Sequence, residues 1–109
     1  MSATLTLDTA RSSDGCLVLT ATGEIDLSTV EPFAQALSSA VAEAVNGGGG
    51  TVTVDLSRVE YLDSAGVNVL FPHAEHIRVI AHPFLVRVFD ISGFTDLAAV
   101  EPAAPADEA

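Results

Sequence analysis

A strand that leads through a short turn into a helix is the feature that most constrains the fold of this chain. Residues 51–66 read TVTVDLSRVEYLDSAG, and the β-branched run over 51–56 is typical of a buried strand. A helix that begins at Ala65 is expected after the turn, capped by Ser64 or Asp63. A helix start has unpaired N–H groups and the positive end of the helix dipole. The Ser64 hydroxyl is therefore expected to be held outward, as a phosphorylation switch requires.

The charge of the chain limits the partners that it can bind. Its 109 residues carry a formal net charge of −11, with four arginines and no lysine. Binding to nucleic acid or to an anionic membrane needs cations, so we expect neither, and a protein partner with a basic surface is favoured. No signal peptide and no membrane-spanning run is recognised, and the single Cys16 allows no internal disulfide. A cytoplasmic protein with Cys16 as a small core residue is predicted.

Periodicity and turn residues divide the chain into strands and helices. A capping box of Ser28 and Glu31 predicts the start of the first helix. Pro72 predicts that the helix after Ser64 kinks or ends near Phe71, and Gly93 ends the last long helix. Strands are expected over 4–8, 16–22, 51–56 and 77–81, helices over 29–45, 65–71 and 83–92, a turn over 23–28, and a short helical turn over 96–100.

This order of elements predicts the fold class. An N-terminal hairpin followed by alternating strands and helices indicates an α/β protein, in which a mixed β-sheet of hairpin and parallel strands is covered by helices. Residues 1–100 are expected to form a single domain. Residues 101–109, which are rich in proline, alanine and acidic residues, are expected to form a disordered tail.

Three polar residues are candidates for function, and each has a structural alternative. Ser64 could be a plain N-cap, since serine is among the best capping residues. Asp26 could be a solvated loop acid, but parallel strands would bring its turn to the same sheet edge as Ser64, where such folds bind their ligands. Asp55 stands where a response-regulator receiver is phosphorylated; receivers also need a lysine, so we expect Asp55 to be structural, bonded to loop amides.

Metal and hydrolase chemistry are poorly supported by the sequence. His73, Glu75 and His76 could chelate a metal only with His82 as a third ligand, so no metal site is expected. A serine hydrolase needs a Gly-x-Ser-x-Gly elbow, and Leu62 stands where its first glycine belongs.

Three segments together resemble a known family, the STAS domain of bacterial anti-sigma factor antagonists. VDLS at 54–57 followed by LDSAG at 62–66 resembles the phosphorylation loop of that family. GEIDL at 23–27 is similar to the turn before its first helix, and VFDISGF at 88–94 is similar to the end of its later helix. The resemblance covers about residues 4–100 and implies a STAS-like fold.

The resemblance also implies a mechanism. The unphosphorylated protein would bind an anti-sigma factor that is also an ATP-dependent serine kinase, and a sigma factor would be released. Phosphorylation of Ser64 would end the association, and a PP2C-type phosphatase would reset it. Asp26, Asp63, Ala65 and Gly66 would lie with Ser64 at the partner surface. The chain would be a switch rather than an enzyme, without a cofactor.

One departure from the family keeps an alternative open. The segment from Gly66 to Arg78 is shorter than the family usually has, and Pro72 falls within it. The alternative function is a STAS-like regulatory or ligand-sensing subunit of a transport or signalling assembly, which is not phosphorylated.

Overall fold

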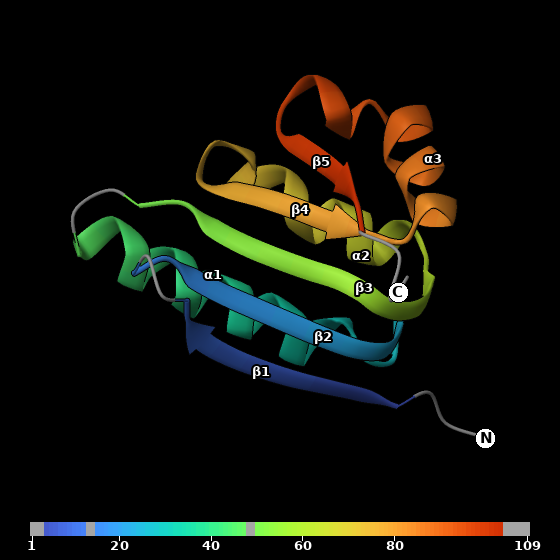
Figure 1. The fold of residues 1–109 in the computed structure, drawn as a ribbon. Helices are drawn as coiled ribbons and strands as arrows, with labels where there is room; N and C mark the ends of the chain where they lie inside the picture. Colours follow the sequence, from blue (N-terminus) through green and yellow to red (C-terminus); the bar gives the residue numbers. More distant parts are fainter. Residues whose placement is uncertain (1–3, 13–14, 48–49, 104–109) are drawn as a thin grey trace, which may run out of the picture.

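A five-stranded mixed sheet organises the molecule (Figure 1). The computed structural model describes residues 4–12, 15–47 and 50–103. The strands β1 to β5 stand side by side in chain order; β1 pairs antiparallel with β2, and the other neighbours are parallel. The elements are β1 (Leu5–Arg11), β2 (Leu17–Ile25), α1 (Val30–Asn46), β3 (Val52–Leu62), α2 (Ser64–Leu70), the 3-10 helix η1 (Phe71–His76), β4 (Ile77–Ala81), α3 (Pro83–Ser92), the 3-10 helix η2 (Phe94–Asp96) and β5 (Ala99–Pro102).

The core lies between one face of the sheet and the helices. Alternate residues of the central strands are buried on that face, whereas their neighbours, such as Thr20 and Asp55, are half-buried on the other. Figure 1 shows α1 and α2 on one side of the sheet. The largest fully buried side chains in the described chain come from strands and helices alike: Phe33, Phe89, Phe94, Leu19, Ile25, Leu37, Leu56, Leu70, Leu85, Val52, Val54 and Val79. The predicted α/β class, with a hairpin and parallel strands, is confirmed.

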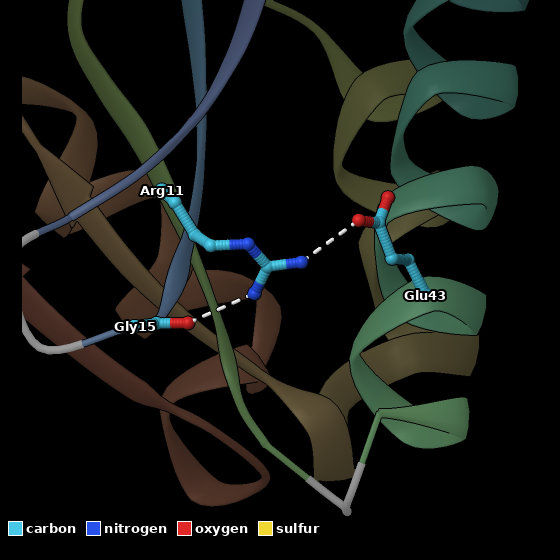
Figure 2. A network of polar contacts seen from close by, with 3 residues as sticks. All are labelled: Arg11, Gly15 and Glu43. Atoms are coloured by element: carbon cyan, nitrogen blue, oxygen red, sulfur yellow. Dashed lines mark hydrogen bonds and ion pairs between the residues drawn. The ribbon is translucent and has the colours of Figure 1, made fainter.

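A polar contact ties the first strand to the first helix at one end of the sheet (Figure 2). Arg11 of β1 donates to the carbonyl of Gly15 at 3.0 Å and pairs with Glu43 of α1 at 2.9 Å. Both charged side chains are more than half exposed, so this pair contributes little to the free energy of unfolding. Cys16 is half-buried and not a core residue, contrary to the sequence prediction.

The two central strands extend further than the sequence predicts. Residues 23–25 continue β2 and residues 57–62 continue β3, although both stretches read as turns. The two extensions pair with each other up to Ile25 and Leu62, so strand pairing overrides the local turn preference. Gly23 has a φ of +117° and lies against the backbone of Thr4, which only glycine permits.

Two further local predictions are wrong. The N-cap of α1 is Thr29 and not Ser28; the Ser28 hydroxyl donates to Asp26, and the Thr29 side chain makes no capping hydrogen bond. The helical turn expected over 96–100 is absent: η2 ends at Asp96 and β5 follows. Because β5 pairs with β4 as far as Pro102, the expected tail does not begin at residue 101; residues 104–109 of that tail lie outside the described residues.

Most other boundaries agree with the sequence to within one residue, but β1 continues to Arg11 although its strand is expected to end at Asp8. The helix after Ser64 ends at Leu70, and Pro72 stands in the first turn of η1, as its missing N–H predicts. β4 covers Ile77–Ala81 as expected. Gly93 ends α3 in the left-handed conformation, with a φ of +86°. Within the described ranges, no helix combines the length and the apolar character needed to cross a bilayer.

Candidate functional site

The candidate site lies where β2 and β3 end together. These strands are parallel, and Ile25 pairs with Leu62 at their carboxyl ends. The next residue, Asp63, donates its backbone N–H to the Ile25 carbonyl at 3.2 Å. Asp26 and Asp63 therefore follow adjacent strand ends, as the parallel arrangement predicted.

Asp63, and not Ser64, caps α2. Its Oδ1 accepts the backbone N–H of Ala65 at 2.9 Å and that of Gly66 at 3.3 Å. Ser64 is the first residue of the helix and is exposed. Its hydroxyl makes no hydrogen bond within the described part of the chain. The capping role thus belongs to Asp63, and the Ser64 hydroxyl is left free at the surface.

Gly66 seats α2 against the strand ends. The residue is buried, and a Cβ built on it would clash with the Leu62 side chain and lie 2.8 Å from Cγ2 of Ile25. Such a contact is closer than real Cβ atoms make. A larger residue at this position would force these side chains or the helix to shift, so the glycine allows α2 to approach the sheet where Ser64 now lies.

Asp26 organises the turn that leads into α1. Its Oδ1 accepts from the backbone N–H of Ser28 at 2.8 Å and from the Ser28 hydroxyl at 2.6 Å. The hydroxyl of Thr29 donates to the Glu24 carbonyl at 2.8 Å and accepts the Asp26 N–H at 3.0 Å. The Ser28 hydroxyl holds the pKa of Asp26 below its usual value, because it stabilises the ionised carboxylate. Asp26 is therefore a fixed negative charge at this edge.

A groove between α2 and α3 opens beside Ser64. It has a volume of about 530 Å³ and is mostly apolar. Its described lining consists of Leu62, Asp63, Ser64, Val67, Asn68, Phe71, Val88, Ile91 and Ser92. The Phe71 ring is packed edge-to-face against Phe94, with centroids 5.2 Å apart. We call this feature the α2–α3 groove.

Among these lining residues, only Asp63 and Ser64 are site residues predicted from the sequence. Val88 and Ile91 belong to the helix expected over 83–92, whose apolar residues do not by themselves separate its two faces. In the structure Leu85 and Phe89 face the core, whereas Ile91 is 87% exposed. The sequence signal that could have revealed the groove is the number of apolar residues in α3, which is larger than a helix with a single buried face needs.

The other candidate residues lie outside this site. Asp55 accepts from the backbone N–H of Ser57 at 3.0 Å and from its hydroxyl at 2.6 Å, in keeping with the predicted structural role. His82 caps α3 by accepting the Phe84 N–H at 3.1 Å. In the part of the chain that the structure describes, no group of three or more side chains is arranged to hold a metal ion.

The match to a family model accounts for most of the chain. The model described as "Mlab, STAS domain" matches residues 9–99. The chain therefore belongs to the STAS domain family, and the family expected from the sequence is confirmed. No protein with a curated description matches it in sequence.

Solved structures with the same fold include anti-sigma factor antagonists. One from Mycobacterium paratuberculosis is 27% identical with a TM-score of 0.79, and the match covers 92% of this chain and 87% of that chain. SpoIIAA in its unphosphorylated form is 20% identical with a TM-score of 0.68, over 92% of this chain and 90% of that chain. The Bacillus cell fate determinant SpoIIAA in its phosphorylated form is 19% identical with a TM-score of 0.64, over 92% of this chain and 93% of that chain. The fold is therefore that of anti-sigma factor antagonists.

Proposed function

We propose that this protein is a cytoplasmic anti-sigma factor antagonist that is switched by phosphorylation of Ser64. The unphosphorylated form binds an anti-sigma factor that is also a serine kinase, and this kinase releases its sigma factor. The kinase then transfers the γ-phosphoryl group of ATP to Ser64 Oγ, ADP leaves, and the hydroxyl proton passes to a base of the kinase. A PP2C-type phosphatase removes the phosphate.

The observation that carries the proposal is the division of roles at the start of α2. Asp63 supplies the cap, while Ser64 is exposed with a hydroxyl that bonds to nothing in the described chain. Ser64 is therefore not explained as the residue that caps the helix. The relative from Mycobacterium paratuberculosis and the two forms of SpoIIAA, one of them phosphorylated, support the same assignment.

A phosphate on Ser64 would act on binding and not on folding. It would add a charge of about −1.5 to −2 to an exposed hydroxyl. Asp26 and Asp63 already make this edge negative, and the chain carries a net charge of −11. A partner that covers Ser64 must desolvate that added charge, which is costly. Asp26, Asp63, Ser64 and Ala65 form the proposed partner surface, and the buried Gly66 supports it by seating α2 against the strand ends.

The test is affinity purification from the native cytoplasm with four baits: wild type, Ser64→Ala, Ser64→Glu and Ser38→Ala. Ser38 is the matched control, because it is an exposed serine of α1 that does not line the α2–α3 groove. We expect an anti-sigma factor kinase on every bait except Ser64→Glu. Mass spectrometry is expected to find phosphate on Ser64 of wild type and of Ser38→Ala.

Two results would contradict the proposal. One is an unphosphorylated Ser64 after incubation of the wild type with the recovered kinase and ATP. The other is a kinase retained equally by Ser64→Glu and wild type while circular dichroism shows that both are folded.

The α2–α3 groove favours a second candidate function. A largely apolar groove of about 530 Å³ lies within the size range of small-molecule sites. The chain would then be a ligand-sensing or regulatory subunit of a transport or signalling assembly. A ligand that raises the midpoint of thermal unfolding of wild type and of Ser64→Glu equally, without any phosphorylation of Ser64, would support this function instead.

A further inference from the structure

Ile91 stands out among the apolar side chains of the surface. It is 87% exposed, the highest value among the large hydrophobic residues in the described ranges. It stands near the end of α3 and lines the α2–α3 groove together with Val67 and Phe71. Large exposed apolar residues beside a groove mark interaction sites more often than isolated ones do.

The lining of the groove is poorly suited to an acidic side chain. Asp63 is the only ionisable residue among its described lining residues, and its Oδ1 is engaged in capping α2. An acidic segment would be repelled by Asp63 and by the net charge of −11. An uncharged apolar side chain on a neutral or basic surface fits the lining best.

We infer that the α2–α3 groove receives a large apolar side chain of the kinase that phosphorylates Ser64. This inference rests on the proposed function and adds Val88 and Ile91 of α3 to the partner surface. Ser64 lines the groove, so a kinase that reaches its hydroxyl must cover the same hollow. An apolar anchor seated in a pocket at the centre of a contact is a common source of binding energy between proteins.

The geometry explains how one phosphate can end the association. The phosphate would stand at the rim of the groove that the apolar side chain fills. Burial of that side chain would then remove water from the phosphate without offering it a hydrogen-bond partner. Phosphorylation and filling of the groove therefore exclude each other.

The test compares Ile91→Ser with Leu97→Ser. Both change a large exposed apolar residue to serine, but Leu97, which is 57% exposed, does not line the groove. Affinity for the kinase recovered with the Ser64→Ala bait is measured by isothermal titration calorimetry. We expect Ile91→Ser to raise the dissociation constant by about tenfold or more and Leu97→Ser by less than about twofold. Val88→Ala serves as a second groove variant.

The outcomes separate this inference from the proposed function. Equal affinities of Ile91→Ser and wild type, with binding still lost in Ser64→Glu, overturn the groove inference and leave the function standing. Unimpaired binding of Ser64→Glu contradicts the function itself. Thermal unfolding of each variant shows whether a lost affinity has a folding cause.

A probe that needs no partner completes the test. Indole, the ring of a tryptophan side chain, is titrated into protein with ¹³C-labelled methyl groups. We expect shifts at Val67, Val88 and Ile91, weaker shifts when Ser64 carries phosphate, and none at Leu97. Equal shifts at Leu97, methyl signals that depend on protein concentration, or a small molecule found in the groove by native mass spectrometry would each overturn the inference. The last two would identify a second copy of this chain or a metabolite as the occupant.

Discussion

At the scale of single residues, Asp63 and Ser64 are both of a type that can cap a helix, but only Asp63 caps α2. The carboxylate of Asp63 accepts two helix N–H groups, while the Ser64 hydroxyl is uncommitted. Loss of a capping side chain typically costs about 1 kcal/mol. Alanine is a good helix former, so it is tolerated at the first position of α2.

The first prediction follows from this division. We expect Asp63→Ala to lower the free energy of unfolding by about 1 kcal/mol and Ser64→Ala to change it by less than about 0.5 kcal/mol. Urea unfolding followed by circular dichroism measures both. The reverse order of the two losses would restore Ser64 as the structural cap.

The second prediction concerns the carboxyl group of Asp26. Its folded-state pKa is lowered, so its ionised form stabilises the native state above the unfolded value of 3.8. That contribution is lost as the pH falls below 3.8 through the folded-state pKa. Ser28→Ala removes the largest cause, so we expect the pKa of Asp26 to rise toward its usual value. An NMR titration of the carboxyl carbon measures it, with Ser38→Ala on the exposed face of α1 as the control that leaves it unchanged.

At the scale of elements, the short helix α2 depends on its seat against β2 and β3. The missing side chain of Gly66 allows Leu62 and Ile25 to pack against the helix. A methyl group there must displace these side chains or the helix. The position of Ser64 is thus coupled to packing beneath it.

The third prediction tests this seat. We expect Gly66→Ala to lower the free energy of unfolding by about 1–3 kcal/mol and to shift the amide NMR signals of α2. Gly50→Ala is the matched control, because a Cβ at Gly50 would meet no atom within 4 Å. Equal stability of the two variants would show that the strand ends do not hold α2 in place.

At the scale of the whole molecule, the excess of acidic residues opposes folding. The chain has 15 acidic residues and only four arginines, so most of its negative charge is not neutralised. The molecule measures only 39 × 35 × 26 Å, so these charges lie close together. At an ionic strength of about 0.01 M, charges interact over about 30 Å, so repulsion acts across most of the protein. At about 0.1 M this distance falls to about 10 Å.

The fourth prediction is that sodium chloride stabilises the protein. We expect the urea midpoint to rise as salt increases from about 0.01 M to about 0.5 M, because screening weakens the self-repulsion of the native state. Chloride is used because sulfate strengthens apolar burial by a separate effect. A falling midpoint would mean that the ion pairs Arg11–Glu43 and Arg78–Glu101 outweigh the repulsion.

The sequence by itself determined the class of fold, the main elements and the phosphoacceptor candidate. These features could be predicted because hydrophobic periodicity, Pro72 and Gly93 reflect local backbone preferences, which do not depend on contacts with distant residues. The strand extensions over 23–25 and 57–62 and the strand β5 depend on hydrogen bonds to neighbouring strands, which local sequence does not reveal. The choice of Asp63 over Ser64 as cap is a contact between neighbouring residues that the sequence left open. The groove beside Ile91, by contrast, was decided only by the tertiary structure, because its lining residues come from α2, η1 and α3, which are separated in the chain.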